Sequence, residues 1–462
     1  MQRKLIKGGH VISMDPRIGT GGLDVLVKGT RIEEIGAGLS ADDAEIVDAS
    51  DCIVIPGLVN AHMHTWQTAL RGLASNWTLP QYFRSVHAGL ATLFTPDDIY
   101  IGTLVGALNQ LNSGTTTLGD WCHNNPTPAH TDRAVDGLLE SGIRSVFFHG
   151  SPKPDPRPGQ KHFSEIPHAR SEVERLLSER LGSRGELVTL GMAILGPHYS
   201  TYEVSVHDFK LARELELVAS MHCAGLDPKT PDGWERLAQA GLLDSRTNVV
   251  HGNNLTDAQL QMMLGCGVTF SLAPETEMQQ GHGHPITGRL RDAGCGPSLG
   301  ADLESCVAGD MFTVARVALA SQRALDNAAS KASQGSLPPT STLSCDDALA
   351  WITLRGAEAL GLAEEIGSLT PGKQADIVLV RADAMNMRPL HDPVAALIMQ
   401  ANTSNIETVL VAGEYRKRAG ELNYEALVSR LQELEASGAR IGSGLNQLLA
   451  SQWSTPNTPL SF

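Results

Sequence analysis

The chain has 462 residues, with 36 basic against 51 acidic side chains and a formal net charge of −15. This charge repels nucleic-acid phosphates and anionic membrane surfaces, so we exclude both as partners. Hydrophobic residues make up 42% of a chain that is too long for one ordinary core. We therefore expect a large globular unit with an appendage.

The seven cysteines are dispersed and form no C-x-x-C pair. Such a set predicts neither a disulfide framework nor a zinc ribbon, and it is typical of a reducing compartment. The first residues lack the apolar run of a secretion signal, and no stretch of about 18 apolar residues occurs anywhere. These features predict a cytoplasmic protein without a membrane span.

Two patterns follow one another along the chain. Residues 1–55 contain short β-branched segments separated by Gly and Asp, which predicts a small β unit. In residues 56–365, short apolar runs alternate with helical stretches, which is typical of a parallel α/β sheet or barrel. Eight apolar runs can be counted there: Leu58–His64, Thr115–Asp120, Ile143–His149, Leu187–Ile194, Leu217–His222, Asn248–His251, Val268–Leu272 and Pro297–Asp302.

The C-terminal part returns to short strands. Residues 366–420 are expected to pair with residues 1–55 in a composite β-sandwich domain. Before them, Ala328–Ser344 is rich in Ser and Pro and predicts a loop, and Asp346–Leu362 predicts a helix. Residues 421–462 are expected to hold a helix over Tyr424–Ala436 and a polar tail.

Five metal-competent side chains lie at the ends of the apolar runs. His62 and His64 form an H-x-H pair, and residues i and i+2 of a strand point to the same side. His222 ends the fifth run, His251 the sixth and Asp302 the eighth. Because all strands of a (β/α)8 barrel open onto one mouth, we expect these side chains to converge there.

Several segments resemble the metal-dependent amidohydrolase superfamily, in its cytosine deaminase-like and triazine hydrolase-like branch. The resemblance implies an α/β fold, a (β/α)8 barrel with a small β-sandwich built from both chain termini, and a metal at the barrel mouth. The segments are Ile55-Pro-Gly-Leu-Val-Asn-Ala-His-Met-His, Leu111-Asn-Ser-Gly-Thr-Thr-Thr, Gly196-Pro-His-Tyr-Ser-Thr, His251-Gly-Asn-Asn-Leu-Thr, Leu299-Gly-Ala-Asp and Gly367-Ser-Leu-Thr-Pro-Gly-Lys-Gln-Ala-Asp-Ile-Val.

The resemblance also implies roles for the five side chains. His62, His64 and His222 match metal ligands, Asp302 matches a ligand that also accepts a proton from the hydrolytic water, and His251 matches a partner of that water. Binuclear members carry a carboxylated Lys at the end of the fourth strand, where this chain has none, so a single divalent ion is favoured. Zinc is expected, with iron and manganese as alternatives. Such an ion lowers the pKa of its water from 15.7 toward about 7.

One departure from the family pattern concerns the proton shuttle. Deaminases of this branch carry His-x-x-Glu after the fifth strand, whereas this chain has His222-Cys-Ala-Gly225. Glycine transfers no proton, and loss of a positioned acid costs about 10²–10⁴ in rate. Glu275 and Glu277 follow the seventh run and are the candidate catalytic replacements, with a solvated loop as the alternative interpretation.

Four further residues are candidate substrate contacts. His198 matches a substrate-contacting His of the branch, and His282 lies in the same predicted mouth loop as Glu277. Trp66 and Trp121 follow the first two runs and could wall a flat heterocycle, with burial in a packed loop as the alternative.

Together these features predict a mononuclear metal-dependent hydrolase. Its metal-bound hydroxide is expected to attack an sp² carbon of a small heterocyclic, urea- or thiocarbamate-like substrate and to displace a thiol, sulfide, chloride or amine. The alternatives are an aminohydrolase of a nucleobase-like heterocycle with a relocated Glu shuttle, and a catalytically inactive scaffold. A homodimer is expected on general frequency alone.

Overall fold

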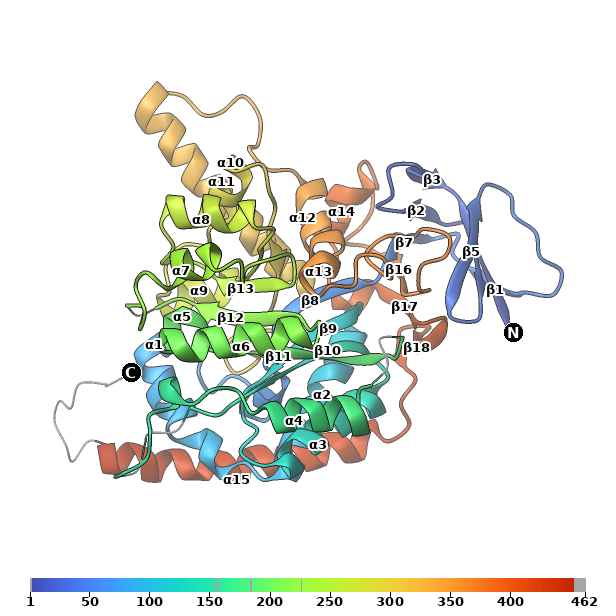
Figure 1. Ribbon diagram of the computed structural model, residues 1–462. Helices are drawn as coiled ribbons and strands as arrows, with labels where there is room; N and C mark the ends of the chain where they lie inside the picture. Colours follow the sequence, from blue (N-terminus) through green and yellow to red (C-terminus); the bar gives the residue numbers. More distant parts are fainter. Residues whose placement is uncertain (1, 154–155, 157, 183–184, 226, 453–462) are drawn as a thin grey trace.

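The centre of the molecule is an eight-stranded parallel sheet curved into a barrel, in a computed structural model that describes residues 2–153, 156, 158–182, 185–225 and 227–452 (Figure 1). Its strands follow one another in chain order, which confirms the predicted α/β barrel. They are β8 (Leu58–Met63), β9 (Thr115–Cys122), β10 (Arg144–Gly150), β11 (Val188–Ala193), β12 (Ala219–Cys223), β13 (Thr247–His251), β14 (Thr269–Leu272) and β15 (Ser298–Leu299).

The last strand returns to the first and nearly closes the barrel. β15 has only two residues, but a parallel bridge joins Met63 to Asp302 just beyond it. The Asp302 N–H donates to the His62 carbonyl over 3.0 Å, and the His64 N–H donates to the Asp302 carbonyl over 2.8 Å. Barrel closure therefore places Asp302 beside the H-x-H pair.

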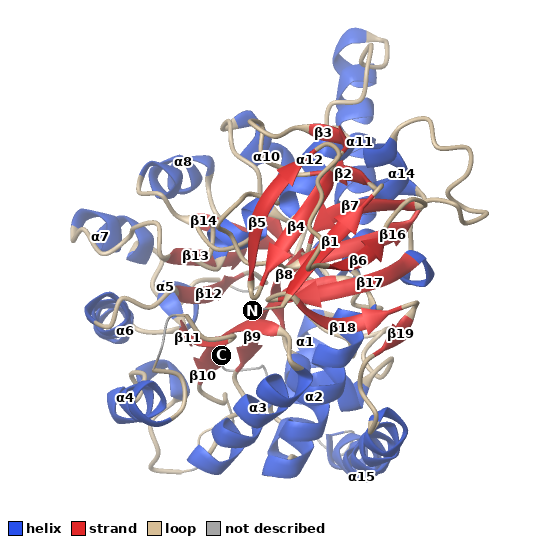
Figure 2. Cartoon of the chain, turned by 90° about the vertical axis from the view of Figure 1, so that its right-hand side faces the viewer, coloured by secondary structure: helices blue, strands red, loops and turns tan. Residues whose placement is uncertain are grey.

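Helices surround the sheet and cover its outer face (Figure 2). The connections between barrel strands contain α2 (Pro96–Asn112), α3 (Pro128–Ser141), α4 (Arg170–Glu179), α6 (Tyr202–Glu214), α7 (Gly233–Gln239), α8 (Asp257–Gly265) and α10 (Thr287–Asp292). Their ends follow from local chemistry: α2, for example, begins at a capping box in which Thr95 and Asp98 bind each other's backbone N–H groups.

Two smaller sheets at one end of the barrel form the predicted β-sandwich. One has the order β5-β4-β1-β6 and the other β19-β18-β17-β16-β7-β2-β3. A separate apolar core that includes Val25, Val54 and Leu379 lies between them. The strands are β1 (Arg3–Lys7), β2 (His10–Ile12), β3 (Thr20–Gly22), β4 (Asp24–Lys28), β5 (Arg31–Gly36), β6 (Glu45–Asp48), β7 (Cys52–Pro56), β16 (Ile377–Arg381), β17 (Ile406–Val411), β18 (Glu414–Arg418) and β19 (Glu421–Leu422).

The sandwich is built from both ends of the chain, as expected. β16 pairs antiparallel with β7, so that Val378 lies opposite Ile55 and the C-terminal strands extend the N-terminal sheet. Only Gly57 separates β7 of the sandwich from β8, the barrel strand that leads to the H-x-H pair.

The helical C-terminal half differs from the sequence prediction in three places. The loop predicted from Ala328 is wrong at its start, because α11 (Met311–Gln334) continues through an Ala-rich stretch until Gly335, whose φ is 72°. The single helix predicted over Asp346–Leu362 is two helices, α12 (Cys345–Trp351) and α13 (Leu354–Ala359). The helix predicted over Tyr424–Ala436 is longer, as α15 (Leu427–Gln452), and the last ten residues of the tail lie outside the described residues.

Further short helical segments complete the connections between the main elements. None of the helices in the described part of the chain has the length and apolar character needed to cross a bilayer. The segments are η1 (Thr65–Leu70), α1 (Leu79–Tyr82), the π-helix η2 (Phe83–His87), η3 (Leu90–Leu93), η4 (Phe163–Glu165), α5 (Gly196–Tyr199), α9 (Pro274–Gln280), α14 (Pro393–Met399) and η5 (Thr403–Asn405).

Candidate metal centre and the pocket around it

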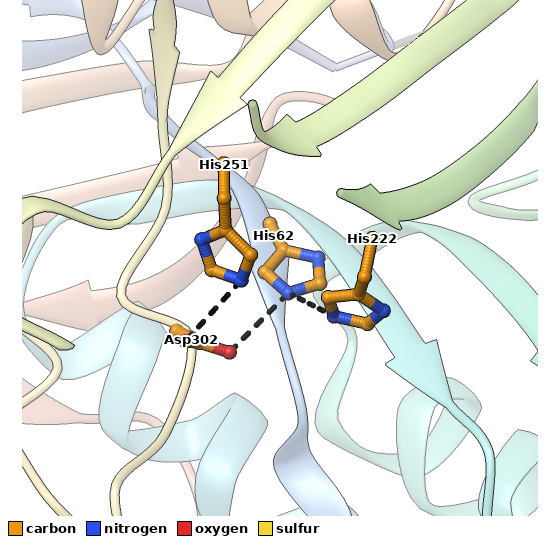
Figure 3. A group of neighbouring side chains, drawn as sticks. All are labelled: His62, His222, His251 and Asp302. Atoms are coloured by element: carbon orange, nitrogen blue, oxygen red, sulfur yellow. Dashed lines mark hydrogen bonds and ion pairs between the residues drawn. The ribbon is translucent and has the colours of Figure 1, made fainter. Parts of the chain in front are cut away.

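The five side chains expected at the barrel mouth do converge. His62 lies in β8, His222 in β12 and His251 at the end of β13, while His64 directly follows β8 and Asp302 lies three residues after β15. All five are buried or nearly so. Figure 3 shows His62, His222 and His251 pointing toward Asp302 from three different strands.

The distances between their polar atoms fit a tetrahedral metal ion. The Nε2 atoms of His62 and His222 are 3.2 Å apart, and Oδ1 of Asp302 is 3.3 Å from His62 Nε2 and 3.4 Å from His64 Nε2. Ligand atoms at about 2.0–2.1 Å from a tetrahedral zinc ion are separated from each other by roughly 3.3–3.4 Å. The residues present therefore fit a divalent ion.

His251 lies on the other side of Asp302. One ligand atom each from His62, His222, His251 and Asp302 lies within 4.8 Å of all the others. His251 Nε2 is 4.0 Å from Asp302 Oδ2, which is longer than the His62 and His64 distances to the same carboxylate. Both His64 and His251 are thus within reach of an ion held by the other three.

Hydrogen bonds fix which nitrogen of these rings faces the centre. Nδ1 of His64 donates to the Trp121 carbonyl over 2.5 Å, and Nδ1 of His251 donates to Oε1 of Glu277 over 3.1 Å. In each ring the Nε2 lone pair is then free to face the carboxylate of Asp302. Metal-ligating histidines are held in this way by their second nitrogen.

Burial keeps most of the imidazoles neutral. It lowers the pKa of His62 and His222 below the usual value, and it lowers that of His64 to about 3. Burial also opposes protonation of His251, but the hydrogen bond with Glu277 and the charges of Asp302 and Glu277 together outweigh it and raise the pKa of His251. For Asp302, burial favours the neutral acid, yet the His62 hydrogen bond and the neighbouring rings lower the pKa overall.

Backbone strain is concentrated at two of these residues. His251 and Asp302 have φ values of 70° and 62°, in the left-handed region that non-glycine residues rarely adopt. Each such conformation costs about 1–3 kcal/mol and persists only where the surroundings enforce it. Here it turns both side chains toward the centre at the point where their strands end.

Glu277 lies behind the centre. It is fully buried at the start of α9, where Oε1 also accepts the Ala273 N–H over 2.8 Å and Oε2 accepts from Asn253 Nδ2 over 3.2 Å. With the His251 contact, these bonds occupy both of its oxygens. Glu277 therefore orients His251, and it is absent from the described residues that line the pocket in front of the centre.

Glu275 points elsewhere. Its carboxylate is partly buried toward the N-terminal end of α11, and burial, with a contribution from Asp310, raises its pKa to about 7. One of its oxygens is buried without a hydrogen-bond partner. Like Glu277, it is not among the described pocket-lining residues.

The expected substrate contacts divide into two groups. His282 lines the pocket, with its ring 4.7 Å from that of His251. His198 is buried and is not among the described residues that line the pocket; its Nε2 donates to the carbonyl of the lining residue Ala224 over 3.0 Å.

The two tryptophans support the pocket from behind. Trp66 is fully buried and packs on Phe94 and His123, with ring centroids 5.1 and 5.5 Å away. Trp121 packs 4.2 Å from the His222 ring and donates through Nε1 to Ser220 Oγ over 3.1 Å. Neither is among the described residues that line the pocket.

Most of the pocket wall comes from residues that the sequence analysis did not single out as substrate contacts. The wall encloses only about 30 Å³, so a substrate larger than a few waters requires some lining side chains to move. His87 and His123 meet in it, with 3.3 Å between their Nε2 atoms. The lining residues that sequence reasoning missed are Leu79, Tyr82, Phe83, His87, Lys153, Tyr199, Ala224, Gln280 and Leu303.

Gly225 stands where the deaminase pattern has its glutamate. Its φ is 87°, and a Cβ atom built on it would lie 2.1 Å from Leu79 Cδ2. Any larger residue at this position would therefore strain the backbone and displace Leu79 from the pocket wall. The missing shuttle is thus reflected in the local structure as well as in the sequence.

Comparisons with known proteins agree with the sequence motifs. The model of the amidohydrolase family matches residues 53–416. An 8-oxoguanine deaminase of Pseudomonas aeruginosa is 30% identical over 436 residues, covering 89% of this chain and 93% of that protein. A 5'-deoxyadenosine deaminase of Methanothermobacter thermautotrophicus is 27% identical over 425 residues, covering 89% and 94%.

Solved structures show the same fold. An atrazine chlorohydrolase from Arthrobacter aurescens TC1, complexed with zinc, has a TM-score of 0.82 at 21% identity, covering 94% of this chain and 100% of that one. An adenosine deaminase from Xanthomonas campestris with bound zinc has a TM-score of 0.80 at 23% identity, covering 95% and 98%.

Proposed function

Because the chain belongs to the amidohydrolase family, we propose that it is a mononuclear zinc-dependent hydrolase of a small heterocyclic, urea- or thiocarbamate-like substrate. One observation carries the proposal: Nε2 of His62 lies 3.2 Å from Nε2 of His222 and 3.3 Å from Oδ1 of Asp302, close to the separation of ligand atoms around a tetrahedral zinc ion. Zinc is further supported by the zinc present in the two similar structures.

We assign the side chains roles as follows. His62, His64, His222 and Asp302 hold the ion, which when bound lowers the pKa of a coordinated water toward about 7. Asp302 accepts the proton of the attacking water, because its lowered pKa keeps it ionised before the reaction. His251 hydrogen-bonds the same water through Nε2, held in place by Glu277.

The reaction replaces one bond at an sp² carbon. The water oxygen forms a new bond to this carbon, its proton passes to Asp302, and the bond to the leaving group breaks. Chloride and thiolate or sulfide depart as anions and need no acid, whereas an amine takes up a proton, for which Asp302 is the nearest source. Residue 225 is a glycine, and no glutamate is among the described residues that line the pocket, which favours the first kind of leaving group.

An ordinary aminohydrolase is the second candidate. It is favoured by the similarity to an 8-oxoguanine deaminase and a 5'-deoxyadenosine deaminase. Glu275 and Glu277, the shuttles predicted from the sequence, are absent from the described pocket wall, and Glu277 has both oxygens occupied. This arrangement weighs against a relocated glutamate.

The test uses the purified, zinc-loaded protein and a panel of chlorotriazines, thiohydantoins, ureas and aminopyrimidines. Chloride, sulfide, amine and ammonia are measured separately, with Asp302→Asn as the inactive control. We expect chloride or sulfide release to be fastest. Fast ammonia release alone would establish the second candidate, and no turnover by a protein with one zinc per chain would indicate an inactive scaffold.

A further inference from the structure

Lys153 brings a positive charge into the pocket. It follows β10 and lines the pocket together with His64, His123 and His222. Its Nζ lies 4.9 Å from the ring centroid of Tyr199 and 5.8 Å from that of Trp121. The two rings hold the ammonium over the site through cation–π contacts.

This ammonium has no acidic partner among the described residues. Burial lowers its pKa to about 8, and none of the carboxylates in the described part of the chain contributes to the shift. The group is therefore still mostly protonated at pH 7. A desolvated ammonium costs free energy unless it is paired, so an anion that reaches it gains more than it would in water.

Three other imidazoles of the wall, those of His87, His123 and His282, carry no comparable charge. Burial lowers the pKa of His87 and His123 well below the usual value and lowers that of His282 to about 4. Among the described lining residues, Asp302 is the single carboxylate, and it faces the histidines of the metal centre. Together with a divalent ion, the lining groups would leave the pocket with a net positive charge.

We propose that Lys153 selects the substrate by binding an anionic oxygen on it, so that the preferred substrate is a heterocycle bearing a carboxylate or a negatively charged ring oxygen. The proposal rests on the proposed function, because it concerns the substrate of the same site. The flexible stem of lysine allows the ammonium to follow the oxygen as the pocket opens. The metal centre then acts on a carbon of the same ring.

Three small pyrimidines of similar size test the proposal by calorimetry with the zinc-loaded protein. Uracil is neutral at pH 7, barbiturate carries its charge on the ring oxygens, and orotate carries it on an exocyclic carboxylate. We expect at least one anion to bind about 10–100-fold tighter than uracil, the usual value of a hydrogen bond to a charged group. Tighter binding of barbiturate would place the charged oxygen of the substrate on the ring, and tighter binding of orotate would place it on an exocyclic carboxylate.

Variants assign the preference to Lys153. Lys153→Met should remove the preference, so that the anion and uracil bind within about twofold of each other, whereas Lys153→Arg should keep most of the preference. Lys161→Met, in the same loop but exposed, is the matched control and should leave all affinities unchanged. Zinc content is measured in every variant and in the natural protein.

The outcomes separate this proposal from the proposed function. An anion preference that persists in Lys153→Met would assign it to the zinc ion and overturn the role of Lys153. Equal affinity of the natural protein for all three probes, or no binding of the anions, would also overturn it. A natural protein that retains no zinc would instead contradict the proposed function.

Discussion

The carboxylate of Glu277 lies 3.1 Å from Nδ1 of His251, on the side of the ring that faces away from the pocket. It therefore fixes the ring so that Nε2 faces Asp302. We predict that Glu277→Gln lowers kcat by about 10–100-fold, the usual effect of losing a carboxylate that orients a metal-site histidine. Because Glu277 acts through His251, the loss should be equal for chloride, sulfide and amine leaving groups.

Glu275→Gln is the matched control for this prediction. Glu275 lies on the same helix but has no contact with His251 and is not among the described pocket-lining residues, so kcat/KM should change by less than about twofold. A loss confined to amine substrates in either variant would contradict the orienting role and restore a relocated glutamate shuttle.

Removal of metal ligands gives the second prediction. His62→Ala and His222→Ala should lower bound zinc and abolish turnover, because each imidazole donates a lone pair to the ion. Asp302→Asn should retain much of the zinc, since the amide oxygen still coordinates, and yet lose activity by several orders of magnitude. Bound zinc is measured by elemental analysis, and activity is measured on the best substrate of the panel.

His64 and His251 are distinguished by the same measurement. If His64 is a ligand and His251 a partner of the water, His64→Ala loses zinc and His251→Ala keeps it while losing activity. If His251→Ala loses zinc and His64→Ala keeps it, His251 replaces His64 in the ligand set. That set would then be His62, His222, His251 and Asp302, whose ligand atoms lie within 4.8 Å of one another.

The fold and the metal centre could be predicted because their signals are local. Seven of the eight barrel strands have four to eight residues, and each candidate ligand lies at or near the end of a predicted apolar run. Parallel strands then bring His62, His222 and Asp302 together without further information. The helix α11 was underestimated because Ser and Pro beyond Gly335 made the whole stretch look like a loop.

The pocket wall could not be predicted in this way. Leu79, His87 and Lys153 lie in irregular connections whose path depends on tertiary packing, and none belongs to a periodic pattern. The sequence suggests that both tryptophans wall the substrate pocket. In the structure Trp121 is buried behind His222, whereas Trp66 lines a neighbouring cavity that shares His123 and Lys153 with the pocket. Likewise, the sequence placed Glu277 in the mouth but gave no indication that its partner is His251.

Acid should destabilise the fold through a histidine pair outside the metal centre. Nδ1 of His149 lies 2.9 Å from Nε2 of His168, and burial lowers their pKa values to about 4 and about 3. In the unfolded chain a histidine titrates near 6.5, so between that value and the folded pKa the unfolded state binds more protons. Stability therefore falls as the pH falls through this window, by up to about 1.4 kcal/mol per pH unit for each histidine.

Thermal unfolding at pH 7, 6 and 5 checks this prediction. Tm should fall on acidification, and His168→Gln should show a shallower fall than the natural protein, because one buried neutral histidine has been removed. His391→Gln replaces an exposed histidine and serves as the control. Identical slopes for all three proteins would exclude a contribution from the pair.

The contact between Gly225 and Leu79 gives the last prediction. Because a Cβ at residue 225 would lie 2.1 Å from Leu79 Cδ2, Gly225→Glu alone should lower Tm and gain no ammonia release from aminopyrimidines. Leu79→Ala removes the obstructing side chain, so Leu79→Ala/Gly225→Glu should lose less stability than the sum of the single variants, with a coupling of about 0.5–3 kcal/mol. If the glutamate then reaches the leaving group, ammonia release should rise by about 10²-fold or more over Leu79→Ala, the usual value of a positioned acid. A gain from Gly225→Glu by itself would show that Leu79 does not keep the acid out, and the preference for anionic leaving groups would then depend on the missing carboxylate alone.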